Sequence, residues 1–404
     1  MFQKGTSGRI RAFVARHPRW TLLRTGLQML DMFLYSSAAK RDSAPFVKDR
    51  SCVQQIHSHF IIASVPCWLI GVWNAGHQAN LALQALALGQ LPGWRGAILD
   101  GIGIGFQPDS ILACFALGLL YFVPLFLLVL AVAGFWGALF AAHRKRPPDA
   151  GLLLFAWLFT LLLPPAAPLL PVALGVSFGT VIGKHIFGGN GFYLISPVVV
   201  GMVFLWLAYP DLVFAASSWV PVPGAEQLGI NPGVLASTSA VEGTTQSAWS
   251  VFLGARPGAM GTTSLLGTVL GALYLLGTAS ASWRIVAGAL LGIAVMLPLF
   301  GAAGSEKDWV IAVSLQLSAG GLLFVAVFVA TDPFAAGMTN TGRWGYGVIV
   351  GVLALLLRQT NPTVGDSVLF ALFIASLLVP LIDAAVITRN KSRRQRKTEG
   401  TLNG

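Results

Sequence analysis

The residues whose types best suit chemistry lie in one polar segment, between Ala236 and Ser264. It reads ASTSAVEGTTQSAWSVFLGARPGAMGTTS, so it is rich in glycine and hydroxyl side chains and has no lysine and one arginine. The chain as a whole is strongly apolar, with a mean hydropathy of +0.74. A polar stretch of this length therefore indicates a built site, and we expect a cofactor there.

A second polar patch, GKHIFGGNGFYLISP, runs from Gly183 to Pro197. Its glycines allow a planar ligand to approach the backbone closely, and Lys184 could meet an anion or the edge of such a ring. A glycine-rich re-entrant turn is the alternative interpretation of this patch.

Two acidic residues lie beside apolar runs. Asp332 lies at the start of TDPFAAGMTNTGRWGYG, and Asp383 lies near the end of the last apolar run. Acidic groups at membrane depth are costly and usually face an ion path or a partner. The alternatives are that Asp332 caps a helix, because Asp-Pro is a common helix start, and that Asp383 is solvated at the membrane interface.

Membrane-spanning helices must position these patches. The 404 residues are 55% hydrophobic and only 10% charged, against about 25% charged residues in soluble domains. Apolar runs long enough to cross a bilayer recur along the chain. We therefore predict an all-α polytopic membrane protein with about ten transmembrane helices and two broken or re-entrant regions. The predicted spans are 58–76, 112–141, 151–163, 168–183, 194–210, 262–279, 283–300, 308–330, 344–357 and 367–387.

The third and fourth of these runs are short, and the sequence PPAAP, Pro164 to Pro168, separates them. Half-length helices are tolerated in membranes only where protein or a cavity satisfies the freed backbone groups. A tight helical hairpin is the alternative.

The net charge of +11 is distributed as in a membrane protein and does not indicate nucleic-acid binding. With ten spans and both termini cytoplasmic, 22 of the 26 lysines and arginines fall on the inner side, as the positive-inside rule requires. We expect a basic amphipathic segment at 1–57, a membrane domain at 58–388 with an outer loop at 211–262, and a basic cytoplasmic tail at 389–404. Arg95, Arg256, Lys307 and Arg358 are the predicted outer charges.

Other candidate motifs are weak. Cys52, Cys67 and Cys114 lack CxxC spacing, so an iron–sulfur cluster or structural zinc held by this chain alone is not expected. His57, His59 and His77 suit membrane-interface positions better than metal or haem ligation. The run GIGIG, Gly101 to Gly105, lacks the flanking strand and helix of a dinucleotide-binding fingerprint.

Several longer runs occur in an order typical of one family. The chain resembles the NqrB/RnfD family, whose members are membrane subunits of Na⁺-translocating NADH:quinone oxidoreductases and of Rnf electron-transfer complexes. The resemblance covers about residues 35–395, and the long N-terminal extension and the GHQ at His77 favour the quinone-reductase subunit. The matching runs are KDRSCVQQIHSHF, GVWNAGHQAN, VAGFWGALFAAHRKR, VALGVSFGTVIGKHIFGGNG, FLGARPGAMGTTS, ASWRIVAG and ATDPFAAGMTNTGRWGYG.

The resemblance implies a membrane subunit that carries flavin and passes electrons toward ubiquinone. In the family, a threonine outside the membrane is esterified to the phosphate of FMN, within the pattern Asp, two variable residues, Ser/Thr, Gly, Ala/Ser, Thr. The aligned stretch here, Ser239 to Thr245, keeps Gly243 and Thr245. It has Ser239, Glu242 and Thr244 in place of the Asp, the Ser/Thr and the Ala. We expect Thr245 to carry FMN, with an unmodified loop as the alternative.

Further roles follow from the same resemblance. Gly188, Gly189 and Gly191, beside Lys184, would lie near a non-covalent riboflavin, and Ala133, Gly134 and Trp136 near the quinone. The acidic residue that the family ties to sodium uptake is Gly137 here, and a glycine offers only its backbone to a hard cation. Asp332 and Asp383 match family acids and are the remaining candidates for an ion path that carries Na⁺ or another ion.

The expected partners are the other subunits of a six-subunit complex, quinone and the lipid of a bacterial inner membrane. NADH would be oxidised on another subunit, because this chain has no dinucleotide fold. The alternatives are an RnfD-type protein of an Rnf complex, a divergent paralogue without covalent FMN, and a secondary transporter whose broken helices hold a solute.

Overall fold

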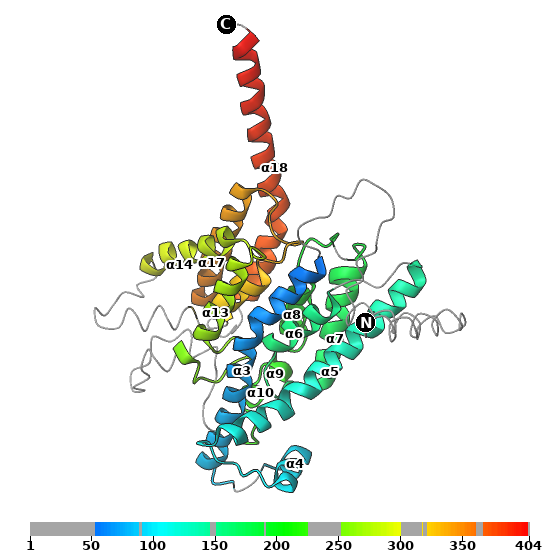
Figure 1. The fold of residues 1–404 in the computed structure, drawn as a ribbon, viewed down its shortest axis with the longest axis vertical. Helices are drawn as coiled ribbons and strands as arrows, with labels where there is room; N and C mark the ends of the chain where they lie inside the picture. The colour runs from blue at the N-terminus through cyan, green and yellow to red at the C-terminus, as the bar shows by residue number, and fades with distance from the viewer. Residues whose placement is uncertain are drawn as a thin grey trace, which may run out of the picture.

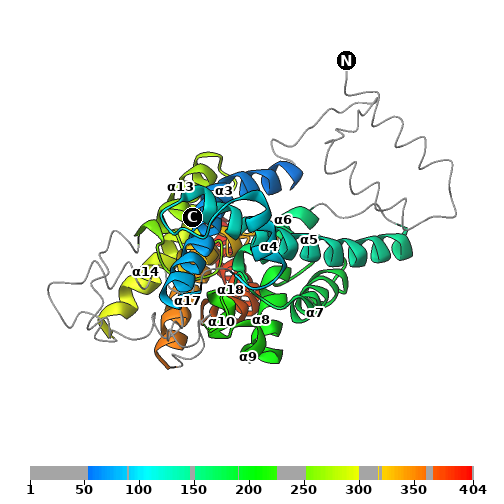
Figure 2. The same ribbon diagram turned by 90° about the horizontal axis from the view of Figure 1, so that it is seen from below.

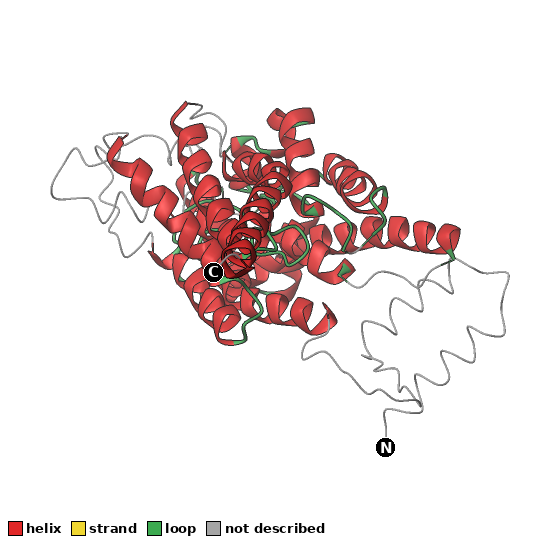
Figure 3. Ribbon diagram, turned by 90° about the horizontal axis from the view of Figure 1, so that it is seen from above, coloured by secondary structure: helices red, strands yellow, loops and turns green. Residues whose placement is uncertain are grey.

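The structure is a computed structural model that describes residues 53–88, 91–145, 151–189, 191–224, 252–299, 317, 321–360 and 367–402. Regular structure within these ranges is entirely helical, as Figure 3 shows. The prediction of an all-α fold is confirmed for this part of the chain. The segment 1–52, which holds the predicted amphipathic region, lies outside the described residues, as do 225–251.

Four helices are long and apolar enough to cross a membrane: α3 (Val53–Ala85), α5 (Ile111–Arg144), α17 (Asn340–Thr360) and α18 (Ser367–Leu402). Each overlaps a predicted span. Pro66, Pro124 and Pro380 lie inside three of them, which membrane helices tolerate. The chain is therefore an integral membrane protein with four clear candidate spans, and the count of about ten stays a prediction.

Shorter helices fall on the other predicted spans or between spans. Helix α6 ends at Leu162 and α7 begins at Leu169, so Pro164–Pro168 separates two half-length helices as predicted. The remaining elements are α4 (Trp94–Ile102), α6 (Leu152–Leu162), α7 (Leu169–Thr180), the π-helical turn η1 (Val181–His185), α8 (Pro197–Ala208), α9 (Pro210–Val213), α10 (Ala216–Trp219), α13 (Leu265–Gly277), α14 (Trp283–Leu299), α16 (Leu322–Phe324) and the π-helical turn η4 (Val325–Val329).

Helices α14, α17 and α18 pack together on one side of the bundle, and α5 to α8 lie on the other, with α3 between them (Figures 1 and 2). Helices α14 and α17 approach closely because glycines lie at their contact. A Cβ at Gly347 would collide with the Ile285 carbonyl oxygen, and one at Gly351 with that of Ala289. Small residues allow membrane helices to pack by close backbone contact.

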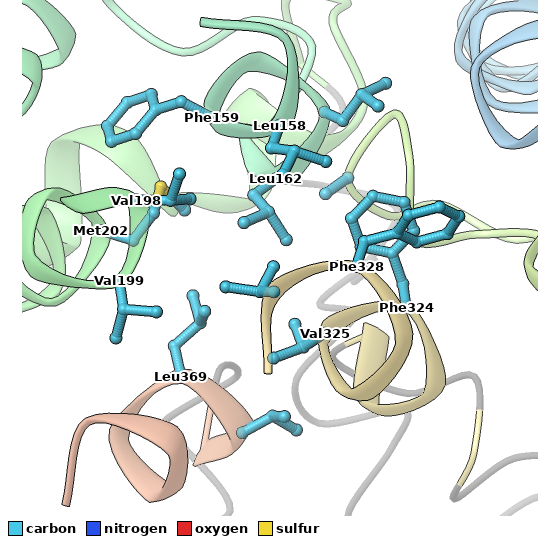
Figure 4. Packing of buried hydrophobic residues seen from close by; sticks show 14 of the residues in the cluster. Leu158, Phe159, Leu162, Val198, Val199, Met202, Phe324, Val325, Phe328 and Leu369 are labelled. Carbon is cyan, nitrogen blue, oxygen red and sulfur yellow. The ribbon is translucent and has the colours of Figure 1, made fainter. Parts of the chain in front are cut away.

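The two sides meet in a hydrophobic core. Side chains of α6, α8, α16, η4 and α18 converge there, as Figure 4 shows. Among them, Phe159, Met202 and Phe324 are fully buried. This core places the short turn η4 directly beside α6 and α8, and the polar residues at the ends of these elements are thereby brought together.

Candidate functional site

A buried polar cavity lies at the end of the bundle where α3 begins. Its volume is about 40 Å³, and five polar side chains from distant parts of the sequence line it. They are His57 of α3, Lys184 of η1, Tyr193 and Ser196 of the loop before α8, and Asp332 of the loop before α17. Apolar side chains such as Phe60, Phe155, Leu158 and Phe328 form the rest of the wall.

Local geometry places Lys184 and Ser196 at the cavity. Helix α7 continues directly into the π-helical turn η1, and this turn contains Lys184, whose side chain is buried. Such π-helical segments are rare and often lie at functional sites. Ser196 immediately precedes α8, which begins with Pro197 at its first position, where proline's missing N–H costs nothing.

Asp332 is half-buried and accepts several hydrogen bonds. The Tyr193 hydroxyl donates to its two carboxylate oxygens at 3.3 and 3.1 Å, and the Phe334 backbone N–H donates at 3.1 Å. Loss of water around this carboxyl raises its pKa above the ordinary value. The hydrogen bonds from Phe334, Tyr193 and Ser196 and the positive charge of Lys184 act in the opposite direction. Both Lys184 and Asp332, predicted separately, therefore belong to one site.

His57 is buried, and its Nδ1 atom has no hydrogen-bond partner among the described residues. Its ring meets the edge of Phe334 with centroids 6.3 Å apart, and Phe334 in turn contacts Tyr193 at 5.8 Å. His59, two residues along, is half-buried, and its Nδ1 pairs with the Tyr274 hydroxyl at 3.0 Å. The structure thus separates two histidines that the sequence analysis assigned alike.

The glycine-rich turn adjoins this cavity. Gly188, Gly189 and Gly191 have φ values of 120°, 103° and 88°, which side chains other than glycine rarely adopt. A Cβ at Gly191 would lie 3.8 Å from the Phe334 ring. Phe187 and Phe192 beside the glycines are 53% and 69% exposed. A flat ring fits against this exposed aromatic turn, whereas a cavity of about 40 Å³ is too small for one.

The predicted quinone residues lie on α5. Ala133 is buried, Gly134 is half-buried, and the Trp136 indole N–H donates to the Ser177 hydroxyl of α7 at 2.9 Å. One turn further, the Phe140 ring stacks on His185 of η1 with centroids 4.7 Å apart. Helix α5 therefore connects the predicted quinone region to the turn that holds Lys184.

Asp383 lies outside the cavity lining and binds the loop that leads from Asp332 to α17. Its carboxylate accepts from the backbone N–H groups of Met338 and Thr339 at 2.8 and 3.1 Å. It also accepts from the Thr339 hydroxyl at 2.5 Å. The Thr339 hydroxyl in turn accepts from the Gly342 N–H at 3.0 Å, in the first turn of α17. Asp383 thus holds one helix start from another helix.

The polar segment at Ala236–Ser264 is described from Phe252 onward, and most of that part is buried. Asn74 of α3 donates to the Arg256 carbonyl at 2.5 Å, and the Gly261 N–H donates to the Leu161 carbonyl at the end of α6 at 2.7 Å. The predicted outer loop 211–262 therefore contains α9, α10 and a backbone stretch packed inside the bundle. Gly243 and Thr245 lie outside the described residues.

Sequence reasoning did not single out His57, Tyr193 or Ser196 as site residues. Tyr193 and Ser196 were within the predicted patch Gly183–Pro197, which was the available signal. His57 carried no comparable signal, because its neighbours in the sequence are ordinary residues of a membrane span.

An all-helical bundle with long apolar helices and a buried, charged cavity defines a polytopic membrane protein with a functional interior. The sequence model described as the NQR2, RnfD, RnfE family matches residues 40–392, and the chain belongs to this family. The resemblance predicted from the ordered runs is thereby confirmed.

Similar proteins carry one name. Proteins from Azotobacter vinelandii and Pseudomonas aeruginosa, both named as the NqrB component of a Na(+)-translocating NADH-quinone reductase, are 38% and 37% identical to this chain over 386 and 384 residues. Both alignments cover 94% of this chain and 94% of the relative. A protein of the same name from Chromohalobacter salexigens is 37% identical over 373 residues, which is 92% of this chain and 90% of that protein.

Proposed function

We propose that this chain is the flavin-carrying membrane subunit of an NADH:quinone reductase complex that couples electron transfer to ion movement. The observation that carries this proposal is the match to NqrB proteins over 94% of both chains. The buried cavity between the quinone helix α5 and the glycine-rich turn supports it, because it gives the membrane domain a charged interior.

Two flavins belong to this proposal. Thr245 is the attachment point of a covalent FMN, and the turn of Gly188, Gly189 and Gly191 holds riboflavin. The exposed Phe187 and Phe192 offer apolar surface for a ring at that turn. A bound flavin supplies the electron chemistry, and the protein supplies position and electrostatic environment.

Ubiquinone is the proposed electron acceptor, near Ala133, Gly134 and Trp136. A Cβ placed at Gly134 would have the Leu152 side chain as its nearest neighbour, at 3.8 Å, so there is open space beside this helix. The adjacent Phe135 is 56% exposed, as expected for a residue that faces lipid or a lipid-soluble quinone.

Asp332 and Asp383 are the acidic residues of the proposed ion path for Na⁺ or another ion. Interrupted helices support such a path, because the end of α6, the start of α13 and the start of α16 adjoin the buried segment at Ala259–Ser264. Helix ends inside a membrane domain commonly surround ion or substrate sites. The complex would have six subunits in a bacterial inner membrane, with NADH oxidised on another subunit.

Covalent flavin on the purified protein tests the proposal. The chain, produced in bacteria together with a flavin transferase, is denatured, and its gel band is inspected for flavin fluorescence. We expect fluorescence in the native chain and in Thr244→Val, and none in Thr245→Val, because only the Thr245 hydroxyl is the proposed ester oxygen. A dark native band, or a fluorescent Thr245→Val band, would remove Thr245 from the site.

A further inference from the structure

His57 is the one polar group of the cavity that neither the family resemblance nor the proposed function uses. Its side chain is 8% exposed, and its Nδ1 atom is buried without a hydrogen-bond partner among the described residues. The same cavity is lined by Asp332, a group that can hold or release a proton. The imidazole and the carboxyl thus meet one enclosed volume from opposite parts of the sequence.

The cavity has the size and lining for water. A volume of about 40 Å³ accommodates about two or three molecules, since one needs roughly 10–15 Å³ on this measure. A buried water also needs two to four polar partners. His57, Lys184, Tyr193, Ser196 and Asp332 provide them. Water in this position would give His57 Nδ1 a hydrogen-bond partner, as buried polar atoms generally require.

We propose that this cavity is a hydrated proton-exchange site in which a proton moves between the Asp332 carboxyl and the His57 imidazole. In the forward step, the proton leaves the Asp332 carboxylic acid, passes along hydrogen-bonded water, and binds His57 Nδ1. The products are a carboxylate and an imidazolium, so charge is conserved and no electron is transferred. The reverse step restores both neutral groups.

The surrounding charges suit such an exchange. The lining contributes Lys184 from η1, Tyr193 from the loop before α8 and Asp332 from the loop before α17, in addition to His57 from α3. Tyr346 of α17 is a further titratable group that experiences the charge of Asp332. Lys184 favours the carboxylate and disfavours the imidazolium, so it keeps the two proton positions from differing by the carboxylate's cost of burial alone.

The site lies beside the proposed riboflavin turn, separated from it by Phe334. Uptake of a proton next to an electron carrier limits the charge that accumulates when the carrier is reduced. This role in the electron relay rests on the proposed function, whereas the proton exchange itself does not.

Infrared spectroscopy of the full-length chain, purified from its own membranes, tests the exchange. The carbonyl-stretch band of protonated Asp332 is followed as a function of pH and assigned by its loss in Asp332→Asn. In His57→Gln we expect the midpoint of this band to move to higher pH by about one unit, a tenfold change in proton affinity. The reason is that no imidazole then competes for the proton or faces the carboxylate as a cation. His59→Gln, changed in the same helix outside the cavity lining, is the matched control and should leave the midpoint in place.

A second measurement needs no variant. In D₂O the Asp332 carbonyl band of the native chain should shift within minutes, because cavity water delivers deuterium. A band that resists exchange for hours, or a midpoint equal in the native chain and in His57→Gln, would overturn the proposal. The flavin fluorescence of Thr245 is independent of both readouts, so loss of the proposed flavin and loss of the proton site are distinguishable.

Discussion

At the scale of single residues, Asp383 shows how an acid near the membrane can be retained for positioning. Its two oxygens accept from Met338, from the Thr339 backbone and from the Thr339 hydroxyl. Hydrogen bonds to a charged acceptor are about twice as strong as neutral ones. The residues held in this way continue into the loop of Asp332 and Phe334, which closes the cavity over His57. Asp383 therefore affects the proposed ion path through this loop.

We expect Asp383→Asn to lower the free energy of unfolding by about 1–3 kcal/mol, because its amide N–H₂ would face backbone donors that then lack an acceptor. Denaturant unfolding in detergent, with and without Na⁺, measures the change, which should not depend on Na⁺. Asp100→Asn, on the exposed surface of α4, is the control and should leave stability unchanged. Equal stability of Asp383→Asn and the native chain would refute the positioning role.

At the scale of elements, hydropathy located helices well and could not locate what interrupts them. The apolar runs and the proline pair of PPAAP predicted α6, α7 and the break between them, because length and helix-breaking residues are local properties. The burial of Met260 and Thr263 was not predictable in this way. It depends on Gly71 of α3, far away in the sequence, which leaves space for a crossing backbone.

The cavity has the same limitation at the level of side chains. Lys184 and Asp332 were predicted separately because each is a charged residue in an apolar context. Their proximity results from α7 continuing into η1 and from the loop after η4 folding against α8, neither of which the sequence pattern specifies. His57 joined them for the same reason, and one turn of helix separates an interface position from a buried one.

Gly71 provides a test at this scale. In Gly71→Ala, the added Cβ would collide with the Met260 carbonyl oxygen, and backbone on both sides must move. We expect a marked loss of folded protein, measured as the monodisperse fraction in detergent by size-exclusion chromatography. Gly101→Ala, where nothing lies within 4 Å of the added Cβ, should behave as the native chain does. A monodisperse Gly71→Ala would show that the segment at Met260 packs elsewhere.

At the scale of the whole molecule, the predicted inner charges gather at one end of the bundle. Arg144 of α5 donates to the His185 carbonyl beside Lys184, and Arg343 donates to the Gly337 carbonyl in the loop after Asp332. The basic second half of α18 projects beyond the same end, and α4 with Arg95 lies at the opposite end (Figure 1). This separation of charge is what the positive-inside rule requires if the α18 end is cytoplasmic.

Labelling of single cysteines tests this orientation. Ser392 on α18 and Asp100 on α4 are both exposed, and the free thiols Cys67 and Cys114 are buried. In a Cys52→Ser background, we expect a membrane-impermeant maleimide to modify Asp100→Cys in spheroplasts and Ser392→Cys only after the membrane is permeabilised. The background chain alone should remain unlabelled. Labelling of Ser392→Cys in sealed spheroplasts would reverse the orientation and place the cavity of His57 and Asp332 at the outer face. Its proton would then exchange with the periplasm, and the flavin ester predicted at Thr245 would lie on the cytoplasmic side.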